Sequence, residues 1–331
     1  MKTEVNRADF LRVLKYVGSV LAPGGAVRFI NGYITATGEN QAATAKFATG
    51  VDLVVPLADL SKVLSKYKAE CVSVWSEANQ LRISTKRSQA GITCLEADNS
   101  DLVGFDCMAE PVAPEFLQAL KVCTKTTAKD HTDPTRSSIH IEGAFVEATD
   151  NFRLTRFKMS EDMKPMLIPV QFAAKISGLE ITHYGIDNTW AFFQSEEEWF
   201  VATRLIDADF PDLSQFTHIH GIELRLPPRL KDMLSRSCIF AKDSDSDLVD
   251  IRVVSGYVDI KAEGEAGWAA ERSRITYDGP ERKFRLNPHH LMAFIESAGT
   301  ITIGDRFLSI SGENCKHIIC LQEVRDVVSE V

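Results

Sequence analysis

The stretch Val51-Asp-Leu-Val-Val-Pro56-Leu-Ala-Asp-Leu60 occurs twice more in variant form, as Leu167-Ile-Pro169-Val-Gln-Phe172 and as Leu286-Asn-Pro288-His-His-Leu291. Each copy predicts a strand, a proline and a short helix, because proline suits the first turn of a helix, where its missing N–H is not needed. The prolines lie 113 and 119 residues apart. Two strands are predicted after each helix: Cys71–Trp75 and Leu81–Ser84, then Ile181–Ile186 and Trp199–Thr203, then Ile301–Ile303 and Phe307–Ile310.

A second pattern precedes each of these stretches. Apolar residues at helical spacing predict amphipathic helices at Asn6–Val20, Ala113–Thr124 and Pro227–Cys238. Each helix leads into alternating apolar residues interrupted by a glycine, which predicts hairpins turning at Gly32, Gly143 and Gly256. Six segments in the same order at one spacing predict three tandem α+β domains, residues 1–110, 111–218 and 219–331, each with two helices and antiparallel sheets.

Composition is that of an ordinary soluble chain of 331 residues, with 44% hydrophobic and 25% charged residues. No apolar run is long enough to span a membrane, and the N-terminus lacks the apolar core of a signal peptide, so a cytoplasmic location is expected. The net charge of −9 excludes a protein that grips nucleic acid with most of its surface. It is compatible with a basic strip on an otherwise acidic molecule.

Motifs of catalysis and metal binding are weak. The seven cysteines are odd in number and form no Cys-x-x-Cys pair, so free thiols are expected. The run Asp243-x-Asp245-x-Asp247 begins like a calcium loop but lacks the required glycine and glutamate. His218-x-His220 and His289-His290 have no third ligand nearby in the sequence. No phosphate-binding loop or Gly-x-Ser-x-Gly elbow occurs, so no cofactor and no catalytic residue is expected.

Positive residues recur on the predicted helices of the three repeats, away from their apolar faces. Acidic residues gather elsewhere, at 196–198, 243–250 and in the tail at 323–330. Cations on helices that touch phosphates without reading bases would give sequence-independent binding of duplex DNA. The residues expected to face DNA are Arg12, Lys15, Lys62, Lys66, Lys121, Lys125, Lys175, Arg229 and Arg236. The alternative for each residue is that it lies on an ordinary solvent-exposed helix face and has no role in binding.

Two segments carry a specific resemblance. Ala148-Thr-Asp-Asn-Phe-Arg-Leu154 resembles the Ala-Thr-Asp-Gly-His-Arg-Leu segment of bacterial DNA polymerase III beta subunits, the beta sliding clamps. Arg204-Leu-Ile-Asp-Ala-Asp-Phe-Pro-Asp212 resembles the Leu-Ile-Asp-Gly-x-Phe-Pro-Asp segment of the same family. The resemblance implies a non-catalytic processivity factor, a head-to-tail homodimer that closes as a ring around duplex DNA. It also implies DNA polymerase and a clamp loader as partners, and no membrane.

The family also has a pocket for short partner peptides between the middle domain, the C-terminal domain and the last strand. Carried over by position, the resemblance assigns this pocket to Ile141, Thr149, Asn151, Phe152, Arg153, Leu154, Pro211, Gln215, Phe216, Ile318, Cys320, Leu321 and Gln322. Apolar walls with a few polar groups suit an extended peptide with hydrophobic anchors.

Departures from the family pattern leave alternatives open. Asn151-Phe152 stands where the family has Gly-His, Gln215 replaces a frequent basic residue, and an acidic tail follows the last strand. Such drift would fit a phage clamp. One alternative is a scaffold of the same fold that recruits partners as a monomer, and another is an enzyme with an unrecognised site.

Overall fold

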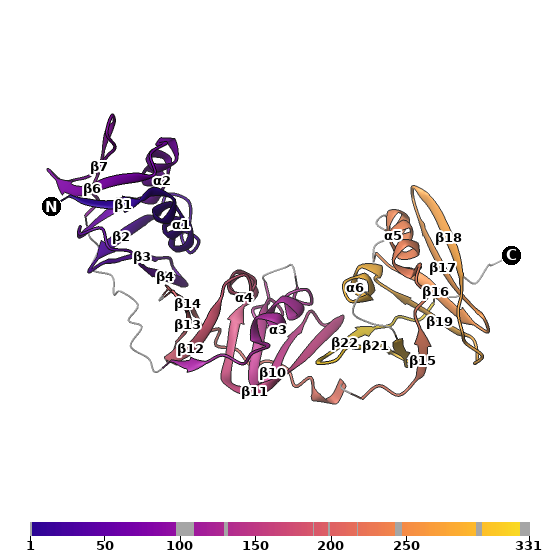
Figure 1. Cartoon of the computed structure of the whole chain (residues 1–331). Helices are drawn as coiled ribbons and strands as arrows, with labels where there is room; N and C mark the ends of the chain where they lie inside the picture. Colours follow the sequence, from indigo (N-terminus) through magenta and orange to yellow (C-terminus); the bar gives the residue numbers. More distant parts are fainter. Residues whose placement is uncertain are drawn as a thin grey trace. The chain divides into compact units, whose positions relative to one another are not determined.

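The computed structural model describes residues 2–96, 109–128, 132–187, 189–197, 199–216, 218–241, 247–295 and 300–324. By its internal contacts the chain divides into two compact units (Figure 1). The first consists of residues 1–112 and 175–205, and the second of residues 113–174 and 206–331. None of the described helices is long and apolar enough to cross a membrane.

The first unit holds two helices beside two antiparallel sheets. One sheet has the strand order β1-β6-β7-β8 and the other the order β5-β2-β3-β4-β14-β13-β12-β9. The elements are β1 (Thr3–Asn6), α1 (Arg7–Gly18), β2 (Ala26–Ile30), β3 (Tyr33–Thr37), β4 (Gln41–Lys46), β5 (Leu53–Pro56), α2 (Leu57–Lys66), β6 (Cys71–Glu77), β7 (Gln80–Ser84), β8 (Gln89–Thr93), β9 (Glu110–Pro111), β12 (Ile181–Asp187), β13 (Trp190–Ser195) and β14 (Trp199–Arg204).

Helix α1 begins where Asn6 places its side-chain oxygen within hydrogen-bond distance of the backbone N–H groups of Ala8 and Asp9, at 2.8 and 3.1 Å. This cap satisfies donors that the first helical turn leaves without partners. The predicted core residues Phe10, Leu14 and Val17 are buried. They pack the helix against β3, β4 and α2, where aromatic contacts extend the core.

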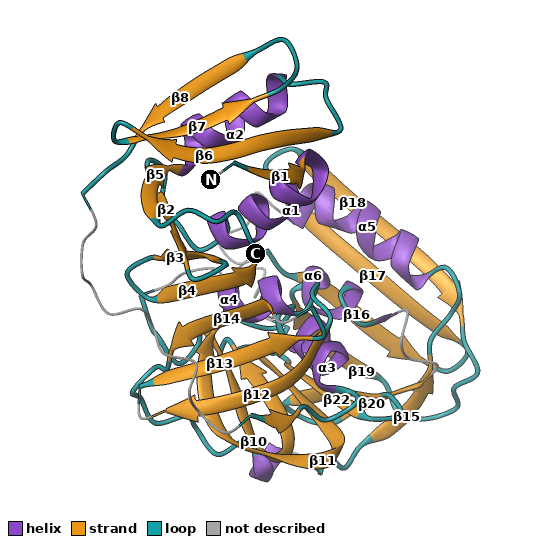
Figure 2. Cartoon of the chain, turned by 60° about the vertical axis from the view of Figure 1, so that its left-hand side comes forward, coloured by secondary structure: helices purple, strands orange, loops and turns teal. Residues whose placement is uncertain are grey.

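The second unit also combines helices with two antiparallel sheets, of strand order β10-β11-β22-β21-β20-β15 and β18-β17-β16-β19. Figure 2 shows α5 lying along β17 and β18. The elements are α3 (Phe116–Cys123), β10 (Ser138–Thr149), β11 (Arg153–Pro169), a 3-10 turn (Ser214–Phe216), β15 (Ile222–Arg225), α5 (Leu230–Ala241), β16 (Val249–Val254), β17 (Tyr257–Gly264), β18 (Gly267–Arg274), β19 (Arg282–Leu286), α6 (Pro288–Met292), β20 (Thr300–Ile303), β21 (Phe307–Ser311) and β22 (Cys315–Cys320).

The six predicted helices are confirmed. Helix α4 (Val170–Ile176), which neither list above contains, follows Pro169. The division between the two units falls within it. The hairpins at Gly32 and Gly256 are also confirmed, and both glycines have a positive φ. The α+β class with antiparallel sheets is thus the class that the sequence predicts.

Two details of the prediction are wrong. Gly143 does not turn the chain: β10 continues through it, and the ladder with β11 shifts register on either side of it. The positive φ of Gly143 serves a bulge there instead. In the second repeat, β13 is the strand that follows β12, so Trp199–Thr203 is one strand later than its predicted place.

Both large sheets run across the predicted domain boundaries. Strand β4 pairs with β14 from Gln41↔Thr203 to Ala45↔Trp199. Strand β11 pairs with β22 from Arg153↔Ile319 to Phe157↔Cys315. The boundaries at residues 110 and 218 stay a prediction.

Candidate functional site

The turn between β10 and β11 is a rigid hydrogen-bonded unit. Asp150 accepts the backbone N–H groups of Phe152 and Arg153, both at 3.0 Å, and the Nε of Arg153 at 2.9 Å. The Thr149 hydroxyl donates to the Arg153 carbonyl oxygen at 2.9 Å. Asn151 has a φ of 72°, a conformation that asparagine tolerates better than most residues. The segment that resembles the clamp family therefore folds into a preformed wall.

Beside this turn lies a pocket of about 350 Å³. Its floor is a small apolar cluster of Leu154, Leu213 and Ile318, which are 7%, 4% and 1% exposed. Phe216 and Phe307 pack against this floor and contact each other edge to face, with ring centroids 5.6 Å apart. An apolar floor under a rim of hydroxyl, amide and guanidinium groups suits a short peptide with one or two apolar anchors.

Residues 210–216, which form one wall of the pocket, contact side chains of β10 and β11. The Phe210 ring stacks on His140 with centroids 4.6 Å apart. His140 in turn lies 3.2 Å from the buried carboxylate of Glu147, which also lies 3.0 Å from Arg156. Hydrogen bonds from Ser214, together with the charge of Arg156, lower the pKa of Asp212. Residues 210–216 are thus held by contacts with β10 and β11 as well as by hydrogen bonds within their own turn.

Nine of the thirteen predicted pocket residues line this pocket, and four do not. The nine are Thr149, Asn151, Arg153, Leu154, Pro211, Gln215, Phe216, Ile318 and Cys320. Ile141 is fully buried in the core, and Leu321 packs on the core of the third repeat. Gln322 forms backbone hydrogen bonds with Arg285 instead. Phe152 is 59% exposed and faces a second pocket.

Three lining residues were missed by the sequence prediction: Asp212, Leu213 and Phe307. Leu213 carried a usable signal, since it is the apolar residue between Pro211 and Phe216. Phe307 carried none, because it reaches the pocket only through the pairing of β21 with β22, which joins distant parts of the chain.

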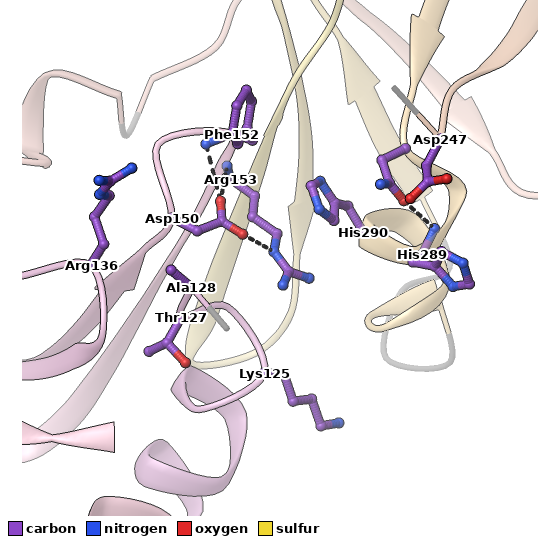
Figure 3. Close-up of a pocket in the computed structure, with 11 residues that line it drawn as sticks. Lys125, Thr127, Ala128, Arg136, Asp150, Phe152, Arg153, Asp247, His289 and His290 are labelled. Atoms are coloured by element: carbon purple, nitrogen blue, oxygen red, sulfur yellow. Dashed lines mark hydrogen bonds and ion pairs between the residues drawn. The ribbon is translucent and has the colours of Figure 1, made fainter. Parts of the chain in front are cut away.

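The second pocket, of about 630 Å³, is also lined by residues of the turn Asp150–Arg153 (Figure 3). Its lining comes from the end of α3, from the turn itself and from the start of α6. The residues are Lys125, Thr127, Ala128, Arg136, Asp150, Phe152, Arg153, Asp247, Asn287, His289 and His290. Within the described part of the chain, no group of acidic, histidine or cysteine side chains is arranged to hold a metal ion.

The residues predicted to face DNA fall into two groups. Six are exposed on or beside the helices: Lys15, Lys62, Lys66, Lys121, Lys125 and Arg229. The other three contact residues of their own unit, although Arg12 and Arg236 are exposed as well. Arg12 lies 3.0 Å from Glu197 and over the Trp199 ring, and Arg236 pairs with Glu271. Lys175 donates to the Ser19 carbonyl oxygen and to Gln41 Oε1, both at 2.8 Å.

Lys175 therefore fastens α4 to the end of α1 and to β4, and its burial lowers the pKa of its ammonium group. Lys175→Met keeps the length of the side chain and removes both hydrogen bonds. We expect a loss of about 1.5–3 kcal/mol in the free energy of unfolding, the usual range for hydrogen bonds to a charged group. Urea denaturation measures it, with the exposed Lys121→Met as the control. Equal stability of the two variants would contradict a structural role.

Large apolar side chains are exposed at four places among the described residues: Leu95, Phe152, Ile239 and Trp268. Phe152 borders the second pocket. The other three lie beside strands at the open edges of the two four-stranded sheets. Leu95 follows the edge strand β8, Trp268 lies in the edge strand β18, and Ile239 lies in α5, which packs on β18. Open edges beside exposed apolar residues are typical of surfaces that pair with another chain.

Solved structures with this arrangement include DNA polymerase III beta subunits. The subunit from Pseudomonas aeruginosa superposes with a TM-score of 0.86 at 15% identity, over 98% of this chain and 100% of that one. The Caulobacter crescentus protein gives a TM-score of 0.86 at 18% identity over the same shares. The Thermotoga maritima subunit gives 0.82 at 16% identity, over 98% and 99%. No protein-family model matches the chain, and no curated protein matches its sequence.

The class that these matches define is the sliding-clamp fold. The chain has this fold over 98% of its length.

Proposed function

We propose that the chain is a sliding clamp, a non-catalytic accessory subunit that encircles duplex DNA and tethers DNA polymerase to it. The observation that carries the proposal is the match of almost the entire chain, repeats included, to polymerase beta subunits. A match to one domain would fit many binding proteins. A match over three repeats supports the one architecture that this family uses.

The mechanism is topological. A closed ring stays on DNA because it surrounds it, so strong contacts with phosphates are unnecessary and would slow sliding. The six exposed cations on or beside the helices supply a weak attraction that does not depend on sequence. Arg12 and Arg236 are partly neutralised by Glu197 and Glu271, which moderates this attraction further.

Ring closure requires two copies of the chain, joined head to tail. In this arrangement the edge strand β8 of one copy pairs with the edge strand β18 of the other, twice per ring. Leu95 from one side and Ile239 and Trp268 from the other would then be covered. The exposed apolar residues at both edges support this pairing.

The pocket with Leu154, Leu213 and Ile318 as its floor is the docking site for partners. An extended peptide from DNA polymerase or from a clamp loader places apolar side chains against this floor. Arg153 and Asn151 on the rim fix the peptide backbone by hydrogen bonds. Different partners use the same pocket in turn.

The ring is tested by electron microscopy of the purified protein together with its mass in solution. We expect six-lobed rings and a mass twice the 36.8 kDa of one chain. A second readout is retention on DNA: rings assembled around closed circular DNA stay bound in high salt and are released when the circle is cut. Compact monomers at every concentration would contradict the clamp and favour the non-encircling scaffold.

A further inference from the structure

At the end of each repeat the chain turns back to the strand that precedes the helix after the repeated proline. A backbone N–H donates there to a backbone carbonyl oxygen, at 2.9 Å in each case: Leu95 to Val54, Ile206 to Leu167, and Gln322 to Arg285. The three repeats therefore begin their exit segments with the same contact. The course of the segment that follows Ile206 is on that account a guide to the residues that follow Gln322.

In the second repeat the exit segment contacts the strand pair from which it leaves. Four residues after Ile206, the Phe210 ring stacks on His140 of β10, with ring centroids 4.6 Å apart. His140 is the residue of β10 that pairs with Leu167. The segment thus returns to the strand position next to its own backbone hydrogen bond.

The third repeat has a pocket at the corresponding place. Asp250 of β16 pairs with Arg285, as His140 pairs with Leu167. Asp250 lines a third pocket, of about 550 Å³, and so does Val324. Val324 is the last residue that the structure describes. The described part of the chain therefore ends at the pocket to which the repeat pattern leads.

This pocket lies on the face of the sheet β18-β17-β16-β19 that points away from α5. On the opposite face, Ile251 and Ile260 belong to the core of the third repeat, and α5 packs there (Figure 2). Arg252 and Lys261 follow these two residues along their strands and therefore point to the pocket side, where they are exposed. The remaining residues of the lining are Asp259, Ala270, Glu271, Arg272 and Lys283.

The acidic side chains of this lining are already neutralised by arginines. Each has a partner among the described residues: Asp250 with Arg285 at 2.8 Å, Asp259 with Arg272 through two hydrogen bonds, and Glu271 with Arg236. An incoming carboxylate therefore meets neutralised groups rather than free anions.

The cations Arg252, Lys261 and Lys283 are paired only with exposed carboxylates outside the lining. Glu281 pairs with Arg252 and lies 3.6 Å from Lys283. Glu263 lies 2.8 Å from Lys261, and its side chain is 67% exposed. Ion pairs exposed to this degree contribute little to stability and exchange partners readily. The lining therefore favours a segment that brings carboxylates of its own.

We propose that residues 325–331 bind to this face of their own chain, with the carboxylates of Asp326 and Glu330 against its cations. Their sequence is Arg-Asp-Val-Val-Ser-Glu-Val. Asp326 holds the position that Phe210 has in the second repeat, four residues after the backbone hydrogen bond. Its partner is Arg252 on the exposed face of β16. Docking of this kind is independent of whether the chain encircles DNA.

A segment of the same chain suits this face better than a separate molecule does. Because residue 325 is bonded to Val324, which already lines the pocket, the segment is present at an effective concentration on the order of millimolar. Weak contacts with three exposed cations are enough to hold it at that concentration. The pocket is then filled by the chain itself and is closed to partners.

The test measures how fast lysines on this face react with the acetylating reagent sulfo-NHS-acetate, with mass spectrometry of the digested protein as the readout. In the full chain Lys261 and Lys283 should react slowly, because residues 325–331 cover them. In a chain shortened to Val324 both should react about tenfold faster, which corresponds to a docking free energy of about 1.4 kcal/mol. Lys121, exposed on α3, is the internal control and should react equally fast in both chains.

A charge exchange in the full-length chain tests the pairing without truncation. Asp326→Arg and Arg252→Glu should each raise the reaction rate of Lys283 towards that of the shortened chain. The double variant should restore the slow rate, because the pair is re-formed with its charges exchanged. Arg274→Glu is the matched control and should leave the rate unchanged, since Arg274 is an exposed arginine of the same sheet outside the lining.

Equal rates for Lys261 and Lys283 in the full and shortened chains would overturn the proposal. So would a double variant that reacts as fast as the two single variants. Slow rates that persist in the shortened chain and rise on dilution would show a second copy of the chain on this face, and would overturn it as well.

Discussion

The double variant Ile239→Glu, Trp268→Glu is expected to be a monomer at concentrations where the wild type forms rings. The two side chains are 61% and 66% exposed within one chain and would be covered at the interface between β18 and the partner's β8. Burying a large apolar side chain contributes about 1.5–3 kcal/mol, so losing two of them weakens the dimer by a hundredfold or more. A newly buried carboxylate weakens it further. Analytical ultracentrifugation over a range of concentrations measures the shift.

The stability of the single chain should hardly change, because both positions already face water in it. Phe152→Glu is the control, since Phe152 is exposed to a similar degree but lies at the second pocket. It should remain a dimer. If the double variant dimerises as tightly as the wild type, the edge beside β18 is not the interface.

Acidification is expected to destabilise the fold through one buried histidine, and the effect should begin near neutrality. His317 is 1% exposed, with Nδ1 2.7 Å from the Thr155 hydroxyl and its ring stacked on Phe294. Thr155 continues the chain to the hydroxyl of Thr126. Burial, and then the charges of Lys125 and Arg153, lower the pKa of His317 to about 3. The histidine is therefore neutral in the folded protein.

The sign follows from the two states. In the unfolded chain the imidazole of His317 binds a proton near pH 6.5, whereas in the folded chain it binds one only near pH 3. The contribution to stability is therefore complete above pH 6.5 and falls as the pH drops, by about 1.4 kcal/mol per unit. Between pH 7 and pH 5 the free energy of unfolding should fall by about 2 kcal/mol. Urea denaturation across this window measures it.

His317→Asn should flatten this dependence, although the variant is less stable at pH 7. His183→Asn should keep the slope of the wild type, because His183 is exposed. A slope that persists in His317→Asn would place the titrating group elsewhere.

The sequence predicts most of the fold because three copies of one pattern support each other. A proline before a helix, or an apolar stripe such as Phe10, Leu14 and Val17, is weak evidence alone and strong evidence when repeated in order. The failure at Gly143 has a physical cause. A glycine with a positive φ serves a hairpin and a bulge equally well, and only the pairing with β11 decides between them.

The site is less predictable than the fold, for reasons that concern contacts between distant residues. The local motif around Asp150 is enough to place Asn151 and Arg153 beside a pocket, because a motif specifies its own turn, and their contact with a partner stays a prediction. It could not show that Ile141 points into the core, or that Phe307 enters through a neighbouring strand. The sequence also does not separate a structural lysine from a solvent-facing one: Lys175 resembles any other helix lysine until Ser19 and Gln41 are seen beside its ammonium group. The predictions for Cys107, Asp243, Asp245 and the tail after Val324 lie outside the described residues.

The pairing of β4 with β14 and of β11 with β22 means that the repeats are not interchangeable building blocks. A fragment cut at residue 110 or 218 would expose a strand edge with unpaired backbone N–H and C=O groups, and such edges promote aggregation. The same strand pairs resist mechanical separation, because pulling one repeat away from the next requires breaking a row of backbone hydrogen bonds. In the ring proposed above, the junctions between the two copies would therefore open before the junctions within each copy.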